Sequence, residues 1–187
     1  GADESLDVLR HALQLPREGN PRARALGAEL RATHTGARSI AAAMLVRYRN
    51  EPFTYTLSPP LLGDNDVDDF LFSTRRGFCE HFAASFVYVM RAAGVPARVV
   101  TGYQGGELNT VGDYMIVRQA YAHAWVEVWL KDEGWVRVDP TAAVSPARIE
   151  SGVVAALPPD QNPVAAGLVK APITTGNGER PKGSVIF

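Results

Sequence analysis

The feature that most constrains the fold of this chain is an apolar stretch with helical spacing that begins at Cys79, its only cysteine. The apolar positions that recur at this spacing are Phe82, Phe86, Val89 and Met90. Gly94, a residue type that commonly follows the last turn of a helix, closes the stretch. We therefore predict a helix that starts at or near Cys79 and runs to Gly94.

The predicted position of Cys79 in the first turn of this helix favours its thiolate form. A helix N-terminus combines the positive end of the macrodipole with backbone N–H groups that have no intrahelical partner, and both stabilise an anion. Arg75 and Arg76 add two positive charges just before the cysteine. The thiolate is the nucleophilic form, so Cys79 is a candidate nucleophile. The alternative is a small buried residue without a chemical role.

Two β-rich runs downstream carry the partners that a cysteine nucleophile needs. Residues 122–130 and 134–141 flank a short polar turn, a pattern typical of an antiparallel hairpin. His123 lies on the first run and Asp139 near the end of the second. A nucleophilic cysteine needs a base that takes its proton, and the imidazole needs a carboxylate that fixes its tautomer and orientation. Cys79, His123 and Asp139 together therefore predict a catalytic triad.

The length of the turn decides whether His123 and Asp139 can meet. A three-residue turn pairs Leu130 with Gly134, and it then places Asp139 opposite Trp125. Directly opposed residues share a face of the sheet, so Asp139 would lie one diagonal step from His123, within side-chain reach. A four-residue turn would put the two on opposite faces unless a bulge intervened. The predicted triad therefore requires the three-residue turn.

Four blocks of sequence resemble the transglutaminase-like domains of the papain-like cysteine-enzyme superfamily. The blocks are GFCEHFA at 77–83, RAAGVPARVVTGY at 91–103, AHAWVE at 122–127 and GWVRVDPT at 134–141. More narrowly, they are similar to the extracytoplasmic domains of bacterial membrane-anchored transglutaminases of the TgpA type. The resemblance covers roughly residues 40–142. By position, the family's triad falls on Cys79 as nucleophile, His123 as base and Asp139 as orienting carboxylate.

The resemblance implies an α+β fold with a papain-like transglutaminase core, in which the helix bearing Cys79 packs on an antiparallel sheet bearing His123 and Asp139. It also implies an enzyme that transfers acyl groups from carboxamides: a protein glutamine forms a thioester with the cysteine, and an amine resolves it. A cysteine protease or amidase acting on peptide or cell-wall amides is one alternative. A non-catalytic interaction domain is another.

Four residues near the predicted triad allow more than one interpretation. Trp125 and Tyr103 are candidates for substrate binding, although core packing is the default for Trp125. His81 is a rival base, but one helical step turns its side chain about 100° away from the cysteine, so we favour a structural role. Glu80 either steers amine substrates or caps the helix N-terminus, and we favour the cap. Animal transglutaminases carry a Trp at this position, so their substrate preferences are not transferred.

The remaining pattern predicts helices and short strands on both sides of these motifs. The expected helices are 4–15, 21–34 started by Asn20-Pro21, 40–48 capped by Ser39, and 66–72. The expected strands are 53–57, 97–103 as a central strand, and 113–119. We assign Asp68 and Asp69 to a helix start rather than to catalysis. We divide the chain into a helical segment 1–38 of the same domain, a catalytic core 39–145, and an irregular Pro/Gly-rich tail 146–187.

Composition narrows the function classes further. A net charge of −1 argues against a nucleic-acid partner. One cysteine and four scattered histidines lack metal-ligand spacing, so we expect neither a metal nor a cofactor. No run approaches the roughly 20 apolar residues of a membrane span. The resemblance implies a soluble periplasmic fragment of a protein anchored in the inner membrane, with glutamine and amine substrates on proteins or peptides, and cell-wall components as a further class.

Overall fold

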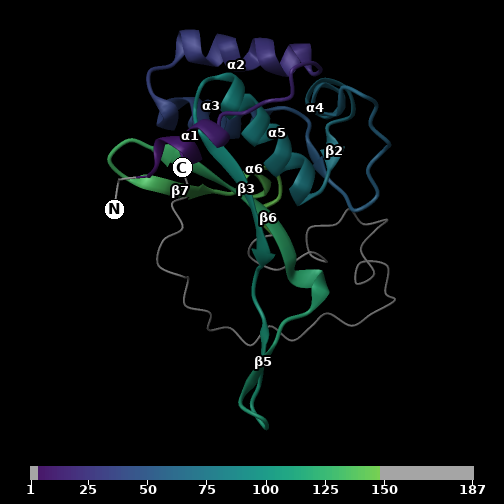
Figure 1. Ribbon diagram of the computed structural model, residues 1–187. Helices are drawn as coiled ribbons and strands as arrows, with labels where there is room; N and C mark the ends of the chain where they lie inside the picture. Colours follow the sequence, from purple (N-terminus) through teal and green to yellow (C-terminus); the bar gives the residue numbers. More distant parts are fainter. Residues whose placement is uncertain (1–3, 148–187) are drawn as a thin grey trace.

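Helix α5 (Cys79–Ala92) runs through the middle of the structure, a computed structural model that describes residues 4–147 (Figure 1). The four apolar residues that predicted this helix are all 0% exposed. Beyond its last turn, Gly94 takes a φ of +78°. The N–H groups of Gly94 and Val95 then donate to the carbonyl oxygens of Arg91 and Met90, each at 2.9 Å, which is the Schellman arrangement. The predicted start and end of the helix are confirmed.

The sheet that packs against α5 has three antiparallel strands in the order β3-β6-β7. The strands are β3 (Ala97–Tyr103), β6 (Ala122–Leu130) and β7 (Gly134–Val138). Strand β6 is central, so the prediction that 97–103 forms the central strand is wrong. Strand β3 lies at the edge of the sheet. At its start, the N–H of Ala97 donates to the carbonyl oxygen of Ala12. Farther along the strand, Val99 is 42% exposed.

The hairpin between β6 and β7 has the predicted register. Leu130 pairs with Gly134, and Val126 pairs with Val138 at the other end of β7. Asp132 and Gly134 take the positive φ values, +76° and +83°, that close so short a turn. The three-residue turn is therefore confirmed, and the side-chain alternation of both strands follows from it.

Helices α2 (Pro21–Thr33), α3 (Ala37–Asn50) and α6 (Pro140–Val144) also contact α5. The structure confirms the α+β class with a papain-like core. Helix α2 crosses the outer surface of the molecule and contacts α5 (Figure 1). Helix α1 (Leu6–His11) precedes them in the chain.

Two predicted helices differ from the structure at their ends. Helix α1 stops well before residue 15, because the Ala12 carbonyl accepts from the N–H of Ala97 at 3.1 Å and the Gln14 carbonyl accepts from Arg91 Nη1 at 2.8 Å. Helix α3 starts before the predicted cap Ser39, whose hydroxyl instead donates to the carbonyl oxygen of Thr35 at 2.7 Å.

The predicted helix at 66–72 is a helical turn, α4 (Asp66–Asp68), followed by the π-helical segment η1 (Asp69–Thr74). Asp68 is buried, and its carboxylate accepts from the backbone N–H groups of Arg22 at 2.9 Å and Ala23 at 2.7 Å. Asp68 thus serves a helix start, as predicted, but that of α2 rather than that of its own segment.

A short parallel pair holds the loop that leads into the cysteine. Strand β1 (Thr54–Tyr55) lies within the predicted strand 53–57 and pairs with β2 (Arg76–Gly77), two residues before Cys79. Below this loop, the Phe70 ring packs edge-on against Phe82 of α5 at 5.1 Å. The start of α5 is therefore held by both backbone pairing and aromatic packing.

An arm projects from the body beyond the ends of β3 and β6 (Figure 1). It is a two-stranded hairpin that returns through the 3₁₀ turn η2 (Gln119–Tyr121); its strands are β4 (Glu107–Asn109) and β5 (Tyr114–Ile116). Strand β5 lies within the predicted strand 113–119 but is shorter, because the end of that range belongs to the turn η2. Most of the predicted tail 146–187 lies outside the described residues. No helix within residues 4–147 has the length and apolarity to cross a membrane.

Helix α2 approaches α5 so closely at Gly27 that an added Cβ would lie 2.5 Å from Ala92 Cβ and 2.9 Å from backbone atoms of Ala92 and Ala93. We expect Gly27→Ala to lower stability by about 1–3 kcal/mol, because overpacking outweighs the gain in helix propensity. Thermal unfolding measures this. A matched Ala25→Gly change on the exposed side of α2 reports propensity alone. A Gly27→Ala variant that is more stable than the parent would contradict the close packing.

Candidate active site

The three predicted triad residues lie at the ends of three elements that meet. Cys79 is the first residue of α5 and is 8% exposed. His123 is the second residue of β6 and is 3% exposed. Asp139 follows β7 directly and is the N-cap residue of α6, although its side chain makes no capping bond. The structure therefore brings these side chains to one place from positions up to 60 residues apart in sequence (79 to 139).

His123 and Asp139 form a direct hydrogen bond. Nε2 of the imidazole lies 2.7 Å from Oδ2 of Asp139. The pairing of Val126 with Val138 puts Asp139 one diagonal step from His123, which is the geometry that the three-residue turn predicts. A carboxylate accepts, so Nε2 donates, and Nδ1 is the ring nitrogen that remains for Cys79.

The environment of His123 favours its charged form. Burial by itself lowers its pKa, but hydrogen bonds to Asp139 and Cys79, and the negative charge on both, outweigh burial, so the pKa of His123 is raised. A raised imidazolium pKa next to a cysteine stabilises a thiolate–imidazolium pair.

Trp125 and Arg137 surround this hydrogen bond. The indole of Trp125 stacks on the His123 ring, with centroids 6.3 Å apart and planes inclined by 26°. The Arg137 guanidinium lies 4.4 Å from the centre of the Trp125 ring, and its Nη2 is 3.6 Å from Asp139 Oδ2. Both side chains restrict the pair, and no motif in the sequence singled out Arg137.

A cavity of about 570 Å³ opens beside Cys79 and His123. Tyr103, one of the two predicted substrate-binding residues, lines it, and its hydroxyl donates to Gln119 Oε1 at 3.0 Å. Trp125, the other, is outside the lining and contacts His123 instead. The lining residues that sequence analysis missed include Tyr55, Leu57, Thr101, Gln119 and Ala120. They come from separate segments and share no local pattern.

His81 points away from the triad into the first turn of α5. Its Nδ1 accepts from the backbone N–H of Phe78 at 3.4 Å, and its ring packs against Phe70 and Phe78. Burial lowers its pKa, although Glu80 and Asp66 oppose that shift. These contacts agree with the structural role that we predicted for His81.

The structure does not place the two arginines that were predicted to support the thiolate in the lining of the cavity. Arg75 lies 3.2 Å from Glu51, and its guanidinium faces the Phe53 ring. Neither Arg75 nor Arg76 is among the described residues that line the cavity. Support for an anion at Cys79 therefore comes from His123 and from the N-terminus of α5. Within residues 4–147, no group of three or more His, Cys, Asp or Glu side chains could hold a metal ion.

A cysteine at a helix N-terminus facing a His–Asp pair on an antiparallel sheet is the arrangement of the papain-like cysteine enzymes. The sequence profile of the transglutaminase-like superfamily matches residues 24–140. The chain belongs to this superfamily.

The chain is also similar in sequence and structure to individual known proteins. A protein-glutamine gamma-glutamyltransferase of Pseudomonas aeruginosa is 58% identical over 79% of this chain, which spans only 22% of that relative. The crystal structure of the periplasmic domain of TgpA from Pseudomonas aeruginosa matches with a TM-score of 0.80 and 54% identity, over 83% of this chain and 54% of that one. A candidate cysteine protease from Cytophaga hutchinsonii matches at a TM-score of 0.54 and 23% identity, over 77% and 45% of the two chains, and shows the fold alone.

We expect Asp139→Asn to lower the pKa of His123, because the hydrogen bond and charge of the carboxylate both raise it. NMR titration of the imidazole, assigned with His123→Ala, measures the shift. Because the pKa of His123 is higher in the folded protein than in the unfolded chain (about 6.5), protonation of His123 stabilises the parent at pH values below the unfolded-state pKa. This stabilisation is lost as the pH rises through the folded-state pKa. The variant should therefore lose stability mainly at acidic pH. An unchanged titration, or an equal shift in the control Asp69→Asn, would contradict the role of Asp139.

Proposed function

We propose that this chain is the catalytic domain of a cysteine-dependent acyltransferase of the transglutaminase type. The observation that carries the proposal is the meeting of Cys79, His123 and Asp139 beside a cavity. The name of the Pseudomonas aeruginosa relative, a protein-glutamine gamma-glutamyltransferase, supports the choice of substrate. Because the chain spans about a fifth of that relative, the activity is proposed for this domain alone.

The first half of the reaction forms a thioester. The Cys79 thiolate attacks the carboxamide carbon of a glutamine side chain, and the resulting oxyanion accepts a hydrogen bond from the Cys79 backbone N–H at the start of α5. His123, protonated in the thiolate–imidazolium pair, gives its proton to the departing nitrogen, and ammonia leaves. Asp139 holds the imidazole through Nε2 so that Nδ1 faces the sulfur throughout.

The second half transfers the acyl group. The now neutral His123 takes a proton from the incoming amine while the new C–N bond forms and the C–S bond breaks. The thiolate leaves and the imidazolium is restored, so the pair is ready for another cycle. Trp125, stacked on His123, is proposed as a positioning residue, and Tyr103 as a residue that contacts substrate at the cavity wall.

The cellular setting is proposed on the same likeness. The match to the periplasmic domain of TgpA supports a periplasmic location, with anchoring in the inner membrane by parts of the protein outside this chain. The proposed partners are proteins or peptides that carry glutamine or amine groups, with cell-wall components as a further class. We also propose that residues 1–38 belong to the catalytic domain, because α2 packs directly on α5.

Mass spectrometry of a glutamine peptide incubated with the protein and a small primary amine tests the activity. Exchange of ammonia for the amine is the expected result. Conversion of glutamine to glutamate indicates hydrolysis, and a cleaved backbone indicates a protease. A peptide left unchanged would favour a non-catalytic interaction domain.

We expect Cys79→Ala to abolish turnover and to change the free energy of unfolding by about 1 kcal/mol or less, because one small side chain replaces another. The peptide assay and thermal unfolding measure the two effects. Retained activity would remove the nucleophile assignment. A large loss of stability would instead favour a purely structural role for the cysteine.

We expect His123→Ala to reduce kcat by about 10²–10⁴-fold, since the general base is lost. His81→Ala should reduce kcat only mildly, through the first turn of α5, because its Nδ1 contacts the Phe78 N–H rather than the thiol. Kinetic measurement of both variants separates the two histidines. An inactive His81 variant beside an active His123 variant would overturn the proposed triad.

A further inference from the structure

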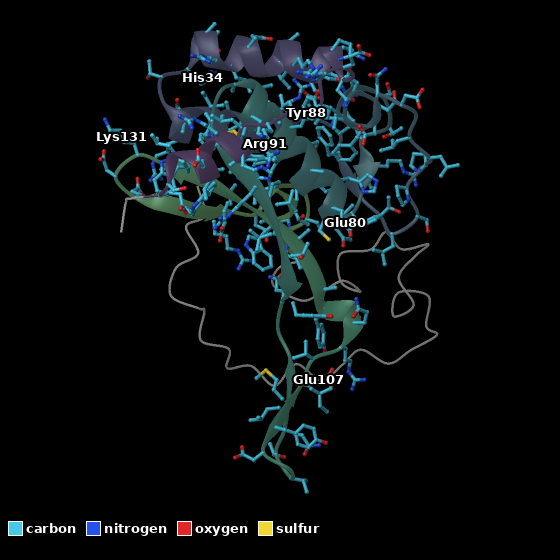
Figure 2. All side chains as sticks on the ribbon, in the orientation of Figure 1. His34, Glu80, Tyr88, Arg91, Glu107 and Lys131 are labelled. Carbon is cyan, nitrogen blue, oxygen red and sulfur yellow. The ribbon has the colours of Figure 1, made fainter. Side chains whose placement is uncertain are left out.

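Glu80 is an exposed, unpaired carboxylate in the lining of the candidate active-site cavity. It follows Cys79 directly and lines the cavity together with Cys79 and His123. Figure 2 shows Glu80 at one end of α5, with Arg91 toward the opposite end. The side chain is exposed and makes no hydrogen bond or ion pair with any of the described residues.

The structure does not support the cap that we predicted for Glu80. The first turn of α5 is held by other groups, since the Phe78 N–H donates to His81 Nδ1 and the His81 N–H donates to the Phe78 carbonyl at 2.9 Å. Glu80 contributes at most a favourable charge at the helix N-terminus. Its carboxylate is therefore available to a ligand.

Glu80 also sets the charge of the cavity. Among the described residues that line it, Glu80 is the sole Asp, Glu, Lys or Arg; the other walls are apolar or uncharged apart from Cys79 and His123. Arg75, a nearby cation in the sequence, is held by Glu51. A smaller hollow next to the cavity shares Glu80 and adds Asp66 and His81, so the charge on this side is acidic as well. Within residues 4–147, no ion pair is formed with the Glu80 carboxylate.

We propose that Glu80 selects cationic acyl acceptors, meaning primary ammonium groups such as the lysine side chain. This inference rests on the proposed function and assigns to Glu80 the discrimination between charged and neutral acceptors. An unpaired charge at the mouth of a low-dielectric cleft raises the local concentration of opposite charges and repels like charges. Glu80 is thus a specificity-determining residue rather than part of the triad.

An ammonium acceptor loses two protons as it becomes the nitrogen of the new amide. The ammonium group approaches the Glu80 carboxylate as an ion pair and releases one proton to solvent, which leaves a neutral amine beside the thioester. The amine then attacks the thioester carbon, gives its second proton to His123, and the C–S bond breaks. The products are the substituted amide and the thiolate–imidazolium pair of Cys79 and His123.

Charged thiol reagents test the field of Glu80 without using the proposed activity. The probes are a cationic trimethylammonium-ethyl and an anionic sulfonatoethyl methanethiosulfonate, both of which attach to Cys79 as mixed disulfides. We expect the ratio of cationic to anionic modification rates to fall about tenfold in Glu80→Gln at low salt. The ratio cancels any change in the thiolate population, because both reagents use the same thiolate. Salt near 1 M, where the Debye length is about 3 Å, should reduce the ratio in the parent.

Acceptor kinetics then test the selection itself. A diamine such as cadaverine carries positive charge near neutral pH, whereas hydroxylamine is neutral. We expect Glu80→Gln to lower the ratio of kcat/KM for cadaverine to kcat/KM for hydroxylamine several-fold, and Glu80→Lys to exceed that effect. The control Glu29→Gln, on the outer helix α2, removes the same charge far from the cavity and should change neither ratio.

Failure of the proposed acyl transfer and failure of the proposed role of Glu80 would give different results. If no nucleophile enters a glutamine peptide while the reagent ratio still falls, the transfer activity is wrong but the electrostatic role of Glu80 stands. If transfer occurs and Glu80→Gln changes cadaverine and hydroxylamine equally, or the reagent ratio matches that of Glu29→Gln, the selection by Glu80 is overturned.

Discussion

The burial of α5 is the constraint on which the rest of the structure depends. Its large apolar side chains are fully enclosed between the outer helices and strands β3 and β6. Each such side chain contributes about 1.5–3 kcal/mol on burial, so a shift of the helix along its axis would expose several of them at once. Because the whole helix is held in register, its first residue is held too. Cys79 therefore reaches the cavity from a rigid element rather than from a loop.

The chemistry depends on a second register, that of the hairpin β6–β7. A one-residue slip would turn Asp139 to the other face of the sheet and break its 2.7 Å hydrogen bond to His123. That bond also raises the pKa of the imidazole, whereas burial acts in the opposite direction. Trp125 and Arg137 pack around the pair on the same strands. The register of β6 and β7 therefore determines whether His123 has the carboxylate partner that its acid–base role needs.

The corrections to sequence-based expectations share a cause. Arg75 and Glu80 both neighbour Cys79 in the chain, yet Arg75 pairs with Glu51 while Glu80 faces the cavity. Asp68 stabilises the start of α2 rather than that of its own segment. Strand β3, whose apolar run suggested a central position, lies at the edge. For Arg75 and Asp68 the residue type was informative, but the partner lies more than 20 residues away, beyond the reach of local patterns.

The sequence by itself determined the helix from Cys79 to Gly94, and it gave the turn length that His123 and Asp139 need in order to meet. These follow from the helical and strand repeats, which act over a few neighbouring residues. Only the tertiary structure decided which segments line the cavity, how the arm leaves the sheet, and which charges remain unpaired at its entrance. Those features depend on contacts between distant segments, because packing and ion pairing are set by proximity in space rather than along the chain.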